Sequence, residues 1–256
     1  MSLAADRPIV VAHRGASVEQ PENTIEAFEA AIDAGADAVE FDVRLTSDGH
    51  AVVMHDPDVS RTTDGSGLLS SMTLRDVRGL KINRPGGGAA GVPTLGEALA
   101  CLSGRAAADV ELKDGLHEPG YVPTGTPALE ATLEELDRAA FVGPVLLSSF
   151  DHATLRRSRA RRPDVPTGLL TEAATDAASA LRAAAADGHP WVLPFVAQVL
   201  EAGSRFAEEV HGIGMRLGVW IADDPGMARA LFVSGVDAVA TNDPRSIVAV
   251  RDEVVG

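Results

Sequence analysis

The sequence predicts an α/β fold, a (β/α)8 TIM barrel, because apolar runs alternate with amphipathic stretches along all 256 residues. Several of the apolar runs lack polar residues at alternate positions, which is typical of parallel strands covered on both faces. About eight β–α units fit a closed barrel better than the alternative, an open doubly wound sheet. The predicted strands are 8–12, 37–43, 51–55, 107–112, 144–148, 165–170, 191–194, 216–220 and 236–240. The predicted helices are 22–34, 94–103, 126–139, 151–161, 173–186, 197–212, 224–233 and 243–252.

The first unit joins the strand 8–12 to a helix with clear start signals. Asn23 and Thr24 are both suitable N-caps for this helix, and Glu26 lies in the first turn, where a negative charge is favourable. The strands 37–43 and 51–55 follow, and a capping-box sequence from Thr94 to Glu97 then opens the second long helix. From this helix to the end of the chain, predicted strands and helices alternate without interruption.

Residues 56–93 interrupt the alternation. The segment is rich in Gly, Ser, Thr and Asp, contains a short helical pattern at 73–80 and ends in the glycines 86–88. We expect a small insertion at the barrel mouth after the second strand region, so that residues 1–256 form a single domain.

Composition excludes several classes of function. The formal net charge of −15 disfavours a nucleic-acid partner, since phosphate backbones require a basic surface. No apolar stretch approaches the roughly 18 residues of a membrane helix, and the first residues lack the basic and long apolar segments of a signal peptide. Cys101 is the single cysteine, so an internal disulfide is excluded and a cytoplasmic, reducing location is predicted. Stable membrane insertion is not expected, and the oligomeric state stays open.

Ionisable residues stand at the ends of the first predicted strands, where the active sites of such barrels form. Glu40 and Asp42 are two residues apart, so their side chains share one face of a strand, and Glu111 ends the next barrel strand. Converging carboxylates repel one another unless a cation lies between them, and oxygen ligands suit Mg²⁺ or Ca²⁺. The alternative is that the three are independent carboxylates paired with arginines.

His13 and His55 are candidates for a general acid and base, because histidine titrates near neutral pH. Either one alone would more often be structural, but two beside a carboxylate cluster favour catalysis. Arg14 offers a planar fork for phosphate oxygens, and Lys113 adds a compact positive charge. Together the residues indicate an anionic substrate that binds a divalent cation and reacts by proton transfer, as a phosphodiester does.

An ordered set of short motifs spans nearly the whole chain: His13–Gly15, Pro21–Thr24, Glu40–Val43, Thr46–Gly49, His55–Asp56, Arg61–Gly67, Pro93–Leu95, Glu111–Lys113, Ser149–Phe150, Trp220 and Gly235–Thr241. Any one of them is weak alone, but the set is specific. In these motifs the chain resembles glycerophosphodiester phosphodiesterases. The resemblance implies a (β/α)8 barrel with a small insertion, and hydrolysis of glycerophosphodiesters to sn-glycerol 3-phosphate and an alcohol.

The resemblance also implies roles for individual residues. Glu40, Asp42 and Glu111 would bind the metal, His13 and His55 would be the acid–base pair, Arg14 and Lys113 would hold the phosphate, Glu22 would brace the first histidine loop and Trp220 would line the glycerol pocket. Which histidine is the base stays open, as does the choice between water and the glycerol hydroxyl as nucleophile. One departure is Asn242, which follows Thr241 where the family commonly has an aspartate.

Two other functions are compatible with these motifs. A lysophospholipase D or sphingomyelinase D-like enzyme would keep the fold and metal but should present an apolar mouth, whereas the insertion here is rich in polar residues, with Leu68, Leu69 and Met72 among its apolar ones. A catalytically silent binding barrel should have lost a histidine or a metal-binding carboxylate, and all five are present.

Overall fold

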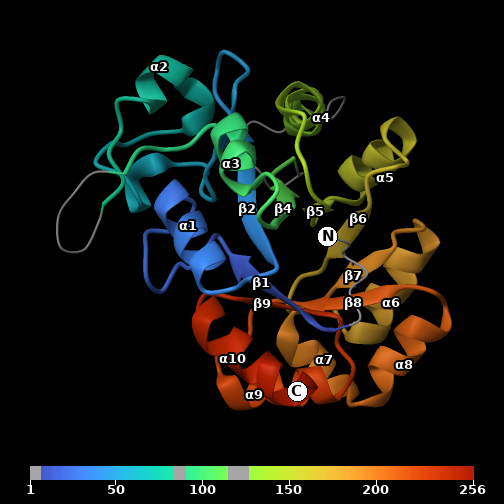
Figure 1. Ribbon diagram of the computed structural model, residues 1–256. Helices are drawn as coiled ribbons and strands as arrows, with labels where there is room; N and C mark the ends of the chain where they lie inside the picture. Colours follow the sequence, from blue (N-terminus) through green and yellow to red (C-terminus); the bar gives the residue numbers. More distant parts are fainter. Residues whose placement is uncertain (1–6, 84–89, 115–126) are drawn as a thin grey trace.

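A computed structural model describes residues 7–83, 90–114 and 127–256, and within them the chain forms a closed barrel. The strands follow the order β1-β9-β8-β7-β6-β5-β4-β2, and parallel pairing of β1 with β2 closes the ring. Figure 1 shows the helices around the outside of these strands. The predicted (β/α)8 TIM barrel is therefore confirmed. Its strands are β1 (Ile9–His13), β2 (Ala38–Leu45), β4 (Ala107–Leu112), β5 (Val145–Ser149), β6 (Thr167–Leu170), β7 (Trp191–Leu193), β8 (Arg216–Val219) and β9 (Ala238–Thr241).

The helices begin where the sequence signals place them. Thr24, not Asn23, is the N-cap of the first helix, because its side chain accepts a hydrogen bond from the Ala27 N–H at 3.1 Å. Thr94 and Glu97 form the predicted capping box. The helices are α1 (Ile25–Asp33), α3 (Leu95–Leu102), α4 (Pro127–Ala139), α5 (His152–Arg161), α6 (Ala177–Ala186), α7 (Val196–Ala202), α8 (Arg205–Gly212), α9 (Pro225–Val233) and α10 (Pro244–Val255).

Two elements differ from the prediction. The run 51–55 gives the short strand β3 (Ala51–Val53), which pairs antiparallel with the end of β2 and takes no place in the barrel ring. The reason is the tight connection at Gly49, which folds the chain back instead of crossing over through a helix. The predicted helix 197–212 is divided into α7 and α8 at Gly203, whose φ of 83° is incompatible with a continuous right-handed helix.

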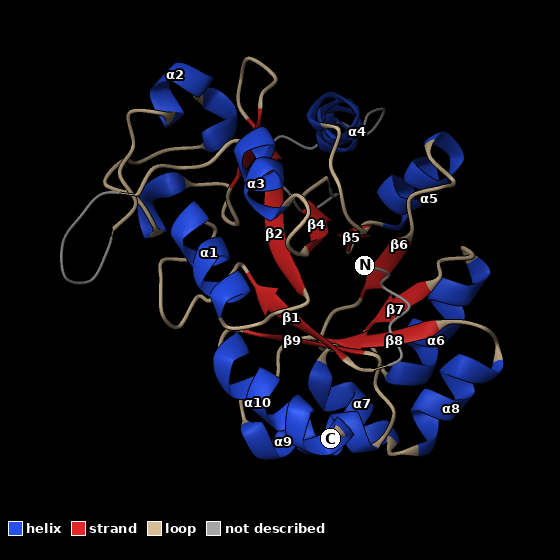
Figure 2. Ribbon diagram, in the orientation of Figure 1, coloured by secondary structure: helices blue, strands red, loops and turns tan. Residues whose placement is uncertain are grey.

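The segment between β3 and α3 forms a small satellite of the barrel (Figure 2). It contains the short helices η1 (Val59–Arg61), η2 (Leu69–Ser71) and α2 (Leu74–Val77). These helices share a separate apolar cluster with Val52 of β3, with Met54 directly after it, and with Val92 before α3. Residues 84–89, which include the glycines 86–88 at the end of the predicted insertion, lie outside the described residues. No helix of the described chain is both long enough and apolar enough to cross a membrane.

Alternation along each strand separates the barrel interior from the layer under the helices. Ile9 and Val11 face the interior, where they pack with Ala38 of the neighbouring strand, Trp191 and inward-facing residues of other strands. Residues of the other phase, such as Val10, pack against the helices. Because side chains alternate with a period of two, the inward-facing phase of each strand continues to its carboxyl end. This phase determines which polar side chains meet at the barrel mouth.

Candidate active site

A cavity of about 230 Å³ opens at the carboxyl ends of the strands and collects most of the predicted site residues. His13 continues the inward phase of Ile9 and Val11, and Glu40 continues that of Ala38. Of the nine predicted site residues, the cavity lining includes His13, Arg14, Glu40, His55, Glu111, Lys113 and Trp220. Asp42 lies beside this lining in contact with Lys113, and Glu22 lies behind Arg14.

Glu40, Asp42 and Glu111 converge on one point, as the sequence predicted. The parallel register places Asp42 directly beside Glu111 on the neighbouring strand. Glu40 lies two residues before Asp42 on β2, so its side chain points to the same face. One carboxylate oxygen from each residue lies within 4.8 Å of the others, and all three side chains are buried. The arrangement has the donor chemistry and the spacing of a site for a hard divalent cation.

The charges around these carboxylates are unevenly balanced. Although burial opposes it, the ammonium of Lys113, 2.9 Å from Asp42 Oδ1, and the guanidinium of Arg14 lower the pKa of Asp42. Burial raises the pKa of Glu111 despite its contact with Lys113. Burial, together with repulsion from Asp42 and Glu111, raises the pKa of Glu40 well above its usual value.

Glu40 shows most directly that the cluster fits a cation. Its Oε1 atom is buried and has no hydrogen-bond partner among the described residues, while Oε2 accepts the Arg14 backbone N–H at 2.9 Å. A buried carboxylate oxygen without a partner is costly. A cation bound by Glu40, Asp42 and Glu111 would satisfy that oxygen and remove the repulsion among the three groups.

The loop after β1 has an unusual backbone that presents these groups. Arg14 and Asn23 have φ values of 57° and 58°, in the left-handed region that few residues other than glycine adopt. Asn23 uses this conformation to donate from Nδ2 to Asp42 Oδ2 at 2.8 Å. The Arg14 guanidinium reaches both Asp42, at 3.4 Å, and Glu22, at 2.9 Å. Strained residues concentrated in one loop at a buried cluster are typical of a functional site.

His13 is half-buried beside Glu40, and Asn242 contacts its other ring nitrogen. Its Nε2 atom lies 3.9 Å from Glu40 Oε2, and its Nδ1 atom lies 2.8 Å from Asn242 Oδ1. Burial, reinforced by the nearby Arg14 charge, lowers the pKa of His13 to about 4. The ring is therefore neutral at neutral pH, as a general base must be.

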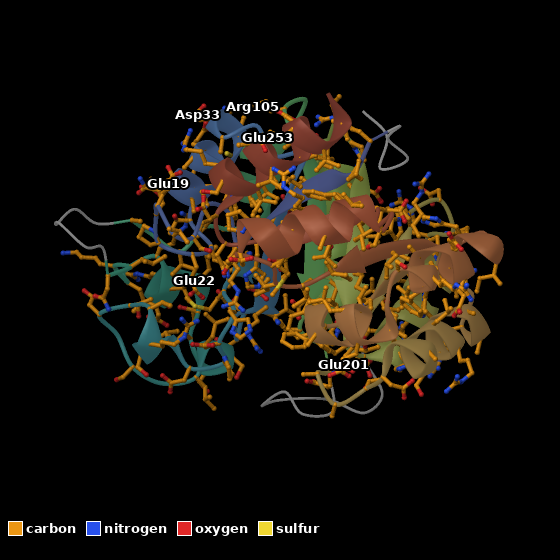
Figure 3. The ribbon with its side chains drawn as sticks, turned by 90° about the horizontal axis from the view of Figure 1, so that it is seen from below. Glu19, Glu22, Asp33, Arg105, Glu201 and Glu253 are labelled. Atoms are coloured by element: carbon orange, nitrogen blue, oxygen red, sulfur yellow. The ribbon has the colours of Figure 1, made fainter. Side chains whose placement is uncertain are left out.

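His55 is oriented by a chain of ion pairs that joins the insertion to the barrel. Its Nδ1 atom lies 2.7 Å from Asp56 Oδ1, and Asp56 in turn pairs with Arg61 of η1. Arg61 also binds Glu22 through two hydrogen bonds of 2.6 and 2.9 Å. Glu22 is labelled in Figure 3, on the side of the molecule where the teal insertion lies. Burial lowers the pKa of His55, whereas Asp42 and Asp56 oppose this shift.

Comparison with known proteins assigns the barrel to a family. Residues 13–246 match the model of the glycerophosphoryl diester phosphodiesterase family. The chain belongs to this family. The family prediction made from the motifs is thus confirmed, and with it the assignment to the phosphoric diester hydrolases.

Relatives of the family resemble the chain over nearly its full length. A glycerophosphodiester phosphodiesterase of Caldanaerobacter subterraneus subsp. tengcongensis is 32% identical over 250 residues, which cover 94% of this chain and 97% of the relative. Another, from Bacillus altitudinis, is 28% identical, with coverage of 96% and 98%. A solved phosphodiesterase of Oleispira antarctica, in complex with the product sn-glycerol-3-phosphate, is 27% identical and superposes with a TM-score of 0.82, covering 98% of this chain and all of its own.

Trp220 forms an apolar wall of the cavity in this phosphodiesterase. Phe150 and Phe195 contact it edge-on, with ring centroids 5.4 and 5.2 Å away. Its indole N–H donates to the Leu193 carbonyl at 3.0 Å, which fixes the ring. Trp220 therefore offers a ring face or edge to a bound molecule, and its N–H group is already satisfied.

Sequence reasoning did not assign functions to four residues that the structure places in contact with the site. Asn23 binds Asp42, Asn242 binds His13, and Asp56 and Arg61 support His55. Asn242 had a signal, since it departs from the aspartate common in the family. Asn23 also had one, because asparagine tolerates the left-handed backbone that a tight loop requires.

Gly15→Ala is expected to destabilise the phosphodiesterase by about 2–4 kcal/mol, as measured by chemical denaturation. The Gly15 φ is 83°, and an added Cβ would lie 2.7 Å from the Ala27 backbone. Gly49 is a matched control, because it has the same φ of 83° with nothing within 4 Å of the added carbon. Gly49→Ala is expected to cost only about 1 kcal/mol. Equal losses for the two variants would contradict a steric role for Gly15.

Proposed function

We propose that the protein hydrolyses glycerophosphodiesters to sn-glycerol 3-phosphate and an alcohol, with a divalent cation, Mg²⁺ or Ca²⁺, as cofactor. The observation that carries the proposal is one cavity lined by two histidines and two positive side chains, with the cluster of three buried carboxylates at its wall. The product bound to the Oleispira antarctica relative supports the chemistry.

Glu40, Asp42 and Glu111 are the residues that would hold the cation. When bound, it would supply positive charge that stabilises the phosphoryl oxygens as negative charge develops on them. Lys113 and Arg14 already balance part of the carboxylate charge, and they add to the positive field that an anionic substrate meets in the cavity. Glu22 orients Arg14 through their 2.9 Å hydrogen bond.

His13 is the general base in this proposal, and His55 is the general acid. His13 is the more strongly neutral ring, so its Nε2 atom is available to take a proton from the attacking hydroxyl, whether of water or of the substrate glycerol. Burial lowers the pKa of His55 as well, but the hydrogen bond between its Nδ1 atom and the Asp56 carboxylate opposes this shift and favours the protonated ring. His55 then gives its Nε2 proton to the departing alkoxide.

The lipid-specific alternative receives less support from the structure. The described part of the insertion shows its apolar side chains Leu69, Val59 and Val77 buried in a cluster of their own, with Leu68 exposed. A phospholipid-specific enzyme would be expected to present a larger apolar area at its mouth. A small glycerophosphodiester therefore fits this barrel better.

The test measures release of sn-glycerol 3-phosphate in a coupled assay. The purified protein is supplied with glycerophosphocholine, glycerophosphoethanolamine or glycerophosphoglycerol, each with Mg²⁺ or with Ca²⁺. We expect turnover of at least one diester, and loss of that turnover in EDTA, restored by excess metal. Lysophosphatidylcholine is supplied as a parallel substrate, and its preferential turnover would support the lipid-specific alternative. No turnover of any diester with either metal would instead favour a silent binding barrel.

A further inference from the structure

Asn242, on the loop after β9, contacts the His13 ring, and Asp223, on the loop after β8, contacts Asn242. Asn242 Oδ1 lies 2.8 Å from His13 Nδ1, and Ser17 Oγ donates to the same oxygen at 2.9 Å. Asn242 donates to Asp223 twice, from its backbone N–H at 2.7 Å and from Nδ2 at 2.8 Å. The Thr241 hydroxyl also donates to Asp223, at 2.9 Å. His13 and Asn242 thus connect the first loop of the barrel to the last two.

Neither Asp223 nor Asn242 is needed to begin the helix that follows it. The N-cap of α9 is Asp224, which accepts from the Met227 N–H at 2.7 Å, and the N-cap of α10 is Asp243. Polar residues in such loops usually serve as caps. Because neighbours already do this, the contacts of Asp223 and Asn242 need another explanation.

The chemistry of the contacts assigns a proton to one ring nitrogen. An ionised carboxylate only accepts hydrogen bonds, so Asn242 must turn its NH₂ group to Asp223 and its carbonyl oxygen to His13. An amide oxygen also only accepts, so His13 Nδ1 must carry the proton. In a neutral ring the lone pair then lies on Nε2, the atom on the Glu40 side.

We propose that Asp223, acting through Asn242, fixes His13 in the tautomer whose Nε2 lone pair serves as the general base. Asp223 and Asn242 are then positioning residues, since neither lines the cavity. The catalytic consequence rests on the proposed function. The tautomer itself is a property of the folded chain and can be observed without substrate.

Asp223→Asn is expected to reverse the donor–acceptor order. The single oxygen of the new amide would keep the Asn242 backbone N–H and the Thr241 hydroxyl, which both contact Oδ1 now. Its NH₂ group would face the NH₂ group of Asn242. Turning the Asn242 amide over removes this conflict and puts an N–H donor against His13 Nδ1. Ser17 can follow the change, since its hydroxyl already lies 3.1 Å from the His13 carbonyl.

The experiment combines histidine ¹⁵N NMR with steady-state kinetics. Spectra are recorded at about pH 8, where neutral rings dominate, and His13→Gln identifies the His13 signals. We expect the Nδ1–H tautomer in the unmodified protein and the Nε2–H tautomer in Asp223→Asn. For glycerophosphocholine turnover, we expect kcat to fall about 100- to 10,000-fold, with KM changed less than about threefold, because the ring stays in place and only its proton moves.

Asp224→Asn is the matched control. It removes the same charge one residue along the chain, and asparagine is an equally good N-cap, so both tautomer and kcat should match the unmodified protein. Asn242→Ala is the second variant. It removes the acceptor, so His13 should show a mixture of tautomers even if Asp223→Asn proves unstable.

Several outcomes would overturn the inference. One is a folded Asp223→Asn variant that keeps the Nδ1–H tautomer, and another is an unchanged tautomer in Asn242→Ala. A reversed tautomer with unchanged kcat would refute the positioning role. Absence of turnover in the unmodified protein, with the tautomer reversing as expected, would refute the proposed function alone and leave the tautomer assignment standing.

Discussion

His13→Ala is expected to lower kcat for glycerophosphocholine by about two to four orders of magnitude, which is the usual contribution of a general base. The fold should survive, because His13 stands at the end of β1 and the barrel core beneath it is formed by Ile9, Val11 and the opposite strands. An unchanged thermal unfolding curve, with the same rise in Tm when Mg²⁺ or Ca²⁺ is added, would show that the variant is folded. Near-normal turnover would refute the assignment of His13.

His55→Ala separates the two histidine roles when two substrates are compared. With an alkyl diester the leaving alkoxide needs a proton, so we expect a loss of about two to four orders of magnitude, as for His13→Ala. With glycerophospho-p-nitrophenol the leaving group is a much weaker base and needs little protonation. His55→Ala should then recover most of its activity, whereas His13→Ala should not. The opposite pattern would exchange the acid and base roles.

Glu40→Gln is expected to abolish the stabilisation of the protein by Mg²⁺ or Ca²⁺ and to lower kcat about a thousandfold, since a bound cation contributes several kcal/mol. For the unmodified protein, ligand at 100 times its Kd adds about 2.7 kcal/mol to the free energy of unfolding. In the absence of metal, the variant should be no less stable, because burial and repulsion from Asp42 and Glu111 already raise the pKa of Glu40. Thermal unfolding with and without metal measures both effects.

The same substitution at a surface position provides the control. Glu201 is exposed near the end of α7, and it is labelled in Figure 3. Glu201→Gln should retain the full metal-dependent shift in Tm and full activity. A metal shift that persists in Glu40→Gln, or a metal-free Tm that falls by many degrees, would contradict the cation site at Glu40, Asp42 and Glu111.

Much of the fold and of the site was predictable because the relevant signals are local. Because side chains alternate between the two faces of a strand, Glu40 and Asp42 of β2 must share a face, and no distant contact alters that. The alternation of apolar runs and capped helices likewise determines a closed barrel, whose carboxyl ends form one rim. β3 shows where local signals fail. Its composition is that of a barrel strand, yet its short connection to β2 makes it an antiparallel extension.

The sequence by itself determined which ionisable side chains stand at the carboxyl ends of the strands and on which face of each strand they lie, because both follow from the residue type and the strand period. Only the tertiary structure decided what orients them. Asn242 contacts His13 across 229 residues, and Arg61 contacts Glu22 across 39. The first contact exists because β1 pairs with β9 as the barrel closes, and the second because the insertion folds back over the loop after β1. No short stretch of sequence predicts either contact, since each depends on how elements far apart in the chain pack together.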